Sequence, residues 1–127
     1  MEKDGNRSTE ENMTMLHTAV ASLWHWTQRE DVSPENLSVG YWQVSRVYCL
    51  LKQPHNARTY GLQALKYARE LSAFYRGYAY ETLARAEMIV NNRVIMKTHL
   101  EKAREMLAQV EGEEEKQLLA KDLESIR

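Results

Sequence analysis

The histidines are the first side chains to test for metal chemistry, because the chain has four of them. His17 and His25 are eight residues apart. On one helix this spacing separates them by about 12 Å, which is too far for both to bind one metal ion. A zinc-binding helix would carry its second histidine four residues after the first, and Ala21 and Arg29 stand at those positions. We therefore expect no metal site and no cofactor.

The single cysteine, Cys49, is the only candidate thiol nucleophile. It falls inside a predicted helix, away from the helix N-terminus that would activate a thiolate, so a buried packing role is expected. The chain has no glycine-rich phosphate loop and no serine in a strand-to-helix elbow. One cysteine also excludes an intrachain disulfide and a four-cysteine zinc site, and it suits a reducing compartment. We expect no enzymatic activity.

The composition is that of one neutral globular domain. The chain has 127 residues, with 17 Lys and Arg against 18 Asp and Glu. No net field favours nucleic acid or a membrane surface. No apolar run approaches the ~18 residues of a membrane span, and the polar N-terminus lacks the apolar stretch of a secretion signal. We expect a cytoplasmic protein that binds neither nucleic acid nor membrane.

Turn signals divide the chain into about six helices, and only two prolines and five glycines are present. Pro34 begins one helix, Pro54 breaks the chain after it, and the Asn91-Asn92 pair ends a later one. No proline lies between residues 55 and 90, so local signals also allow one helix there. We place a turn near Ser72, because a single 36-residue helix would be unusual in so short a chain. The expected helices are 13–30, 34–51, 55–72, 73–90, 93–110 and 113–127, after a flexible segment 1–9.

The first and last of these helices are predicted from apolar stripes at three- and four-residue steps. The stripe of the last helix predicts a capping helix with a solvent-exposed outer face. The first stripe comprises Met13, Leu16, Val20, Leu23, Trp24 and Thr27, and the last comprises Leu119, Leu123 and Ile126.

An internal repeat with an offset of 39 residues is the most informative feature of the sequence. The break at Lys52-Gln53 coincides with the break at Asn91-Asn92, so helix, break and helix align in both copies. A small residue would let the two helices of a pair approach closely. The matched pairs are Tyr41 with Tyr80, Val44 with Leu83, Ser45 with Ala84, Arg46 with Arg85, Leu50 with Ile89, Gly61 with Leu100, and Ala64 with Ala103.

The repeated positions resemble the tetratricopeptide repeat pattern. The first copy reads Tyr41-x2-Val44-Ser45-x2-Tyr48, and the second reads Tyr80-x2-Leu83-Ala84-x2-Glu87. The chain is also similar, for example at His25-Trp26, to a group of short bacterial tetratricopeptide-like proteins. The resemblance implies an all-α stack of antiparallel helix pairs, at about 35–72 and 73–110, within one domain spanning 10–127.

The resemblance also implies a binding groove. In tetratricopeptide domains the first helix of each pair lines the concave surface, which would place Arg46 and Arg85 in one cleft. Two guanidinium groups beside the Trp42 indole would suit a carboxylate, an acidic side chain or a phosphate. The alternative is local pairing: Arg46 stacked on Trp42, and Glu81 paired with Arg85 at i, i+4. The candidate groove residues are His25, Trp42, Arg46, Tyr78, Glu81 and Arg85.

The function that the sequence favours is protein–protein interaction, with a peptide or a partner helix held in the groove. Because a stack of two pairs is short for an independent repeat protein, a homo-oligomer is also expected. The alternative is a sensor of an acidic metabolite, with a cleft formed by Trp24, His25, Trp42, Tyr78 and Glu81.

Overall fold

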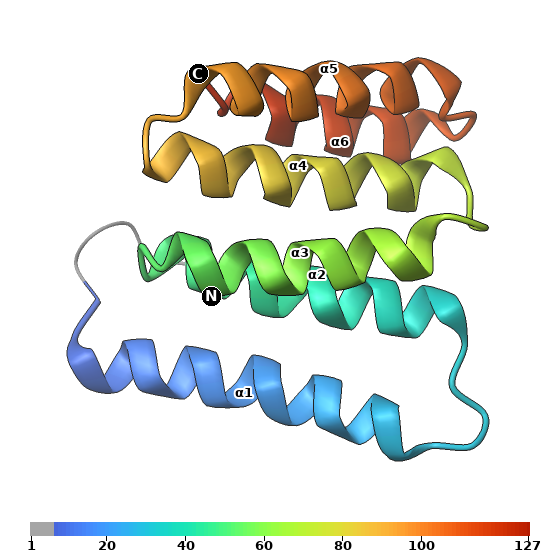
Figure 1. Cartoon of the computed structure of the whole chain (residues 1–127). Coiled ribbons are helices and arrows are strands. Elements are labelled where there is room, and N and C mark those ends of the chain that lie inside the picture. Colours follow the sequence, from blue (N-terminus) through green and yellow to red (C-terminus); the bar gives the residue numbers. More distant parts are fainter. Residues whose placement is uncertain (1–6) are drawn as a thin grey trace.

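The computed structural model describes residues 7–127, and the fold of this range is all-α, with helices joined by short connections (Figure 1). Six helices and no strands lie within it, as predicted. Of the segment 1–9 that was expected to be flexible, residues 1–6 lie outside the described range, and the first helix begins at Thr9. The helices are α1 (Thr9–Gln28), α2 (Pro34–Leu50), α3 (Pro54–Ala68), α4 (Ala73–Ile89), α5 (Arg93–Gln109) and α6 (Glu113–Glu124).

Side-chain capping marks the start of α1 and of α2. The Ser8 hydroxyl accepts from the Glu11 backbone N–H while the Glu11 carboxylate accepts from the Ser8 N–H, which is a capping box. The Ser33 hydroxyl accepts from the Asn36 backbone N–H and so caps α2, and Pro34 follows it, a residue that fits the first helical position. The acidic residues after Gly112 form the first turn of α6, the helix-start role that their position predicts.

The weakly marked turn near Ser72 is present, so residues 55–90 form two helices. α3 ends at Ala68, and Ser72 is the N-cap residue of α4 in an extended backbone conformation, although its side chain makes no capping hydrogen bond. The chain therefore folds back within itself at this point, and no helix continues from the first pair into the second.

Each helix packs against the next helix along the chain (Figure 1). In addition, α2 contacts α4, and α4 contacts α6, so these three helices form a row that we call the inner row. α3 contacts both α2 and α4, whereas α1 contacts α2 alone. The two helix pairs are offset by 39 residues. α2 and α4 begin at residues 34 and 73, and α3 and α5 begin at residues 54 and 93.

Small buried residues let the first pair pack closely, as the repeat predicts. Ser45 is completely buried, and its hydroxyl lies 2.7 Å from the Ala57 carbonyl oxygen and 2.6 Å from the Thr82 hydroxyl. A Cβ added to Gly61 would lie 2.8 Å from Leu83 and 3.3 Å from Ser45. Because no larger side chain fits there, α2, α3 and α4 meet at this point.

The apolar stripe predicted for α1 is wrong in most of its members. Only Leu23 of this 20-residue helix is buried, at a point where its side chain lies against Gly40 of α2. Met13, Val20 and Trp24 are exposed, Trp24 at 65%. An apolar stripe of this kind predicts that the helix buries one broad face. α1 packs against α2 alone, so most of the stripe stays exposed.

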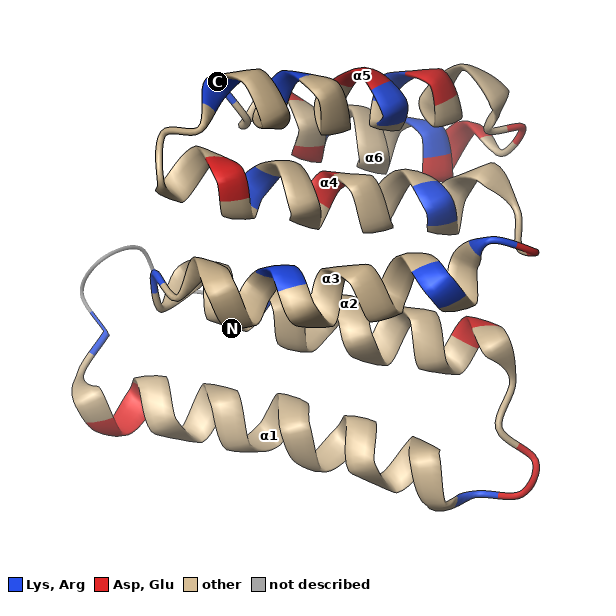
Figure 2. Cartoon of the chain, in the orientation of Figure 1, with Lys and Arg blue, Asp and Glu red and all other residues tan. Residues whose placement is uncertain are grey.

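Charged side chains are distributed unevenly over the fold (Figure 2). Residues 12–28, which make up nearly all of α1, include no Asp, Glu, Lys or Arg. The ribbons of α4, α5 and α6 carry both signs of charge along their lengths. Among the described residues, no helix is long and apolar enough to cross a membrane.

Candidate functional site

Five of the six predicted groove residues meet in one polar cluster at the inner row. Its centre is Glu81 of α4, whose side chain is completely buried. The Trp42 indole donates to Glu81 Oε1 at 2.9 Å, and Arg46 donates to Glu81 Oε2 at 3.2 Å. Arg85, one turn along α4, donates to the same Oε2 oxygen. A buried carboxylate with three donors is fully paired.

The same cluster continues to the last helix. Arg85 donates to the Asp122 carbonyl oxygen at 2.9 Å and to the Ser125 hydroxyl at 2.8 Å. The Tyr78 hydroxyl donates to the Asp122 carboxylate at 2.5 Å, and burial together with this bond raises the pKa of Tyr78. Side chains from α2, α4 and α6 are therefore tied together through one network.

The groove hypothesis predicts that a partner's carboxylate binds Arg46 and Arg85. In the structure, the carboxylate of Glu81 binds both of them. Both local pairings considered from the sequence are present, since Arg85 bonds Glu81 and the Arg46 guanidinium lies 5.9 Å from the centre of the Trp42 ring. Trp42 also meets Tyr78 edge-on, at 5.2 Å between ring centres. The cluster has the bonding of a structural network that holds the inner row together.

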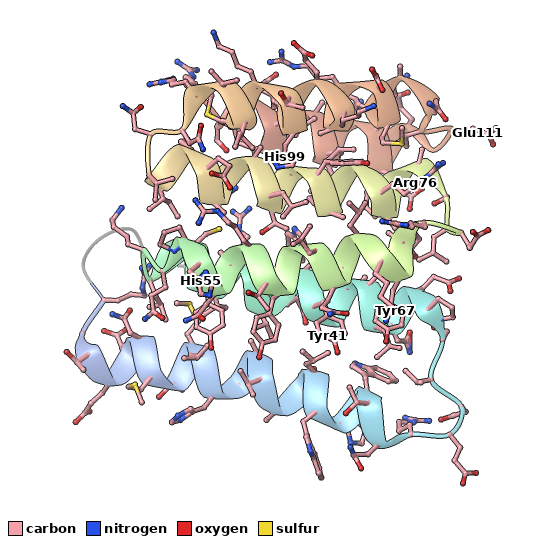
Figure 3. The ribbon with its side chains drawn as sticks, viewed as in Figure 1. Tyr41, His55, Tyr67, Arg76, His99 and Glu111 are labelled. Atoms are coloured by element: carbon pink, nitrogen blue, oxygen red, sulfur yellow. The ribbon has the colours of Figure 1, made fainter. Side chains whose placement is uncertain are left out.

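His25 and Trp24, assigned to the groove or to the sensor cleft, lie outside this cluster. Both are exposed on α1, and His25 has its ring against Trp26 at 5.9 Å. His55 and His99 lie on α3 and α5 and are well separated (Figure 3). Among residues 7–127, no three His, Cys, Asp or Glu side chains gather as a metal site would require.

Cys49 is buried at 6% exposure, and its thiol lies 3.9 Å from the Thr82 carbonyl oxygen. Burial raises the pKa of Cys49 to about 11, so the thiol is protonated at neutral pH. This environment matches the packing role expected from the sequence.

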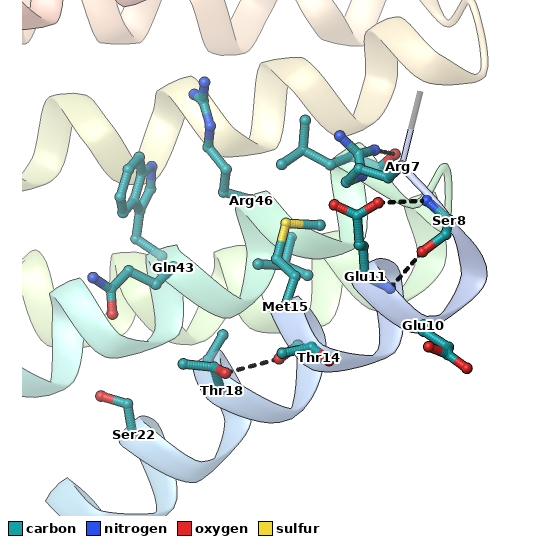
Figure 4. Close-up of a pocket in the computed structure, with 14 residues that line it drawn as sticks. Arg7, Ser8, Glu10, Glu11, Thr14, Met15, Thr18, Ser22, Gln43 and Arg46 are labelled. Carbon is teal, nitrogen blue, oxygen red and sulfur yellow. Dashed lines mark hydrogen bonds between the residues drawn. The ribbon is translucent and has the colours of Figure 1, made fainter. Parts of the chain in front are cut away.

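An open groove of about 740 Å³ runs between α1 and α2 (Figure 4). Its α1 wall follows four-residue steps along the helix, and its α2 wall includes two of the predicted residues, Trp42 and Arg46. The α1 wall comprises Arg7, Ser8, Glu10, Glu11, Thr14, Met15, Thr18, Ala19 and Ser22, and the α2 wall comprises Trp42, Gln43, Arg46, Val47 and Leu50.

The groove is open to solvent and mostly neutral in its middle part. Thr14, Thr18, Ser22 and Gln43 are exposed, and the Thr18 hydroxyl donates to the Thr14 carbonyl oxygen at 2.8 Å. Its charged side chains are restricted mainly to the end where α1 begins, where the Arg7 guanidinium donates to the Leu50 carbonyl oxygen at 3.1 Å. The surface offers methyl, methylene and hydroxyl groups to whatever covers it.

The sequence reasoning missed the α1 side of this groove. The available signal was the uncharged run 12–28 in a chain that is 28% charged. The prediction for this helix concerned only its apolar stripe and not the absence of charge, whereas most of the run is exposed. The chain matches no protein-family model, no curated protein and no solved structure with which it was compared.

Proposed function

We propose that this chain is a protein-interaction module of the tetratricopeptide-like type, which holds a helical segment of a partner protein in the α1–α2 groove and performs no catalysis. The spacing of the two helix pairs and their shared break geometry support the relationship to tetratricopeptide stacks. The groove supports the function, since partner segments commonly lie along apolar grooves between helices.

The observation that carries the proposal is the uncharged surface of α1. An exposed helix on a protein surface normally carries charged residues on its outer side. α1 has none between residues 12 and 28, although only one of its 20 residues is buried. Depletion of charge is a property of the centres of protein–protein interfaces. We therefore assign the α1 surface to an interface.

The dimensions of the groove favour a helix or peptide over a compact ligand. The α1 wall extends from Ser8 to Ser22, which corresponds to about 21 Å at the helical rise of 1.5 Å per residue. An occupant of that length is a segment of about four helical turns. Its apolar side chains would contact Met15, Ala19 and Val47, and its backbone would approach over Thr14, Thr18 and Ser22.

The experiment that tests this proposal compares two matched substitutions. Thr18→Lys places a charge at the middle of the groove, and Thr59→Lys makes the same change on α3. Both threonines are exposed, and each donates its hydroxyl to the carbonyl four residues earlier. Proteins retained from the native cell by the wild-type chain are identified, purified and titrated calorimetrically against each variant. We expect at least a tenfold loss of affinity with T18K and none with T59K; equal affinities would refute the assignment.

Binding of an acidic small molecule is the second candidate function, because the groove volume falls within the range of small-molecule sites and Arg7 and Arg46 line one end. Citrate and inorganic phosphate are suitable probes. A rise in Tm with either probe that Arg46→Gln abolishes would favour this candidate. An unchanged Tm at millimolar probe concentrations would leave the partner helix as the function.

A further inference from the structure

The groove lies where the repeat would place one more helix of the inner row. In the repeat, each residue of α2 corresponds to the residue of α4 that follows it by 39 positions. The α2 wall of the groove therefore corresponds to the face of α4 that α2 covers. Trp42 corresponds to Glu81, Gln43 to Thr82 and Val47 to Ala86. In α4 these positions are occupied by contacts with α2. Glu81 accepts from Trp42, Thr82 lies against Ser45, and Ala86 packs with Cys49. The equivalent face of α2 is the wall of the groove.

The repeat also predicts the direction in which an additional helix would run in the groove. Consecutive helices in the stack are antiparallel, so α2 runs antiparallel to α3, on which it packs (Figure 1). A helix that packs on both α1 and α2 in the corresponding position would run antiparallel to α1. It would also need small residues at four-residue steps, as α2 has with Ser45 and Cys49 toward α4.

We propose that the occupant is α1 of a second copy of this chain, so that two chains associate with each α1 in the groove of the other. This inference rests on the proposed function, because it names the partner of the same groove. A two-fold axis perpendicular to α1 makes the two α1 helices antiparallel, which is the direction that the repeat requires. α1 also carries small residues at four-residue steps, Thr14, Thr18 and Ser22, and these line the groove.

The antiparallel arrangement is self-complementary around Thr18. With the axis at Thr18, Thr14 of one copy faces Ser22 of the other. The acidic first turn of α1, Glu10 and Glu11, then comes close to the last turn of the other copy, whose basic residue is His25. The uncharged run 12–28 brings no like charges together. The result is a four-helix arrangement of α1 and α2 from both copies.

The mass of the chain in solution tests this assembly. Sedimentation equilibrium of the full chain between 1 and 100 μM should give a mass that rises with concentration toward twice that of the 14.9 kDa chain. T18K should shift this to the mass of the monomer over the same range, because two lysines would meet at the axis, and T59K should remain dimeric. Circular dichroism melts of both variants show whether they are folded.

A cross-link tests the position of the axis. Helices packed 8–10 Å apart, each with Cα atoms about 2.3 Å from its axis, bring facing Cα atoms to about 3.4–5.4 Å, which overlaps the range of about 4.4–6.8 Å that a disulfide spans. Mild oxidation should therefore join Thr18→Cys chains in pairs and leave Thr59→Cys chains single. The native Cys49 is buried and should not react.

The outcomes separate this inference from the proposed function. A wild-type chain that is monomeric at 100 μM, or a dimer that T18K does not weaken, overturns the second copy as occupant. A monomeric chain that binds a purified helical partner in a T18K-sensitive manner overturns the second copy alone and keeps the groove as an interaction site. A T18C dimer that fails to cross-link also overturns the proposed geometry.

Discussion

Lys52 and Asn91 are 39 residues apart and have the same left-handed backbone conformation, with φ of 58° at each. The residue after each one returns its N–H to a carbonyl of the preceding helix: Gln53 to Tyr48, and Asn92 to Glu87, both at 2.9 Å. This bond is the long hydrogen bond of a Schellman cap. The two helix pairs thus repeat the geometry of the break as well as the spacing of the helices.

A lysine is poorly suited to this conformation, which costs an L-residue with a Cβ roughly 1–2 kcal/mol, whereas asparagine tolerates it. Lys52→Gly should therefore raise the free energy of unfolding by about 1 kcal/mol, and Asn91→Gly should raise it by less. Lys97→Gly, on an exposed position inside α5, should lower it by about 1 kcal/mol. Urea denaturation measures all three, and a larger gain from N91G than from K52G would contradict this explanation of the caps.

The buried Glu81 should be essential for stability. Glu81→Ala would leave two largely buried guanidinium groups and the Trp42 indole without their acceptor, so we expect a loss of about 3–5 kcal/mol. Glu87→Ala is the matched control. Glu87 bonds Arg58 through both oxygens, but the Arg58 side chain is 36% exposed and can turn to water. We expect E87A to cost less, and equal losses from the two variants would refute the structural role of the Glu81 network.

Stability should depend on pH through His99. Burial lowers the pKa of this half-buried imidazole, which packs against Tyr80 at 6.4 Å between ring centres. Below the unfolded-state pKa of about 6.5, the unfolded chain takes up a proton that the folded chain resists, so stability falls as pH falls. His99→Gln should remove this component.

The check is urea denaturation of the wild type and H99Q at pH 7.5 and 5.5, with His55→Gln as a control for the loss of an exposed histidine. The wild type should lose more stability than H99Q across this interval. Parallel losses in the two proteins would show that burial of His99 does not contribute.

Leu23 should control the docking of α1 alone. Leu23→Ala removes the only buried side chain of α1, at a cost of about 2–5 kcal/mol to the contact with α2. Because α1 touches no other helix, the loss should appear as local opening. Leu100→Ala, equally buried at 6% but within the core around α5 and α6, should destabilise the whole stack. Hydrogen exchange of L23A should accelerate in residues 9–28 and stay unchanged in 93–109.

The sequence predicted the helices of the repeat well because their limits depend on local chemistry. Proline at residues 34 and 54 and asparagine at residue 91 change the backbone at their own positions. The turn at Ser72 carries no such signal and was predicted only from the improbable length of the alternative. It has no side-chain cap in the structure, which explains why local signals were weak.

The candidate site was harder to predict because it depends on which helix faces which. The repeat pairs Arg46 with Arg85, and both bond one acceptor, Glu81, which is a residue of the chain itself. Apolar periodicity cannot distinguish a stripe that packs inside one chain from a stripe that remains exposed. For this reason the stripe of α1 is predicted to be buried although most of it is exposed. The groove beside it depends on the relative positions of α1 and α2, which the sequence pattern does not contain.

In the proposed dimer, α1 lies at the interface between two copies of this chain. Hydrogen–deuterium exchange of the full-length protein at 1 μM and at 100 μM tests it most directly. Exchange of the α1 peptide 9–28 should slow at the higher concentration, whereas exchange of the α5 peptide 93–109 should stay the same. Exchange of residues 9–28 that is independent of concentration would contradict the claim.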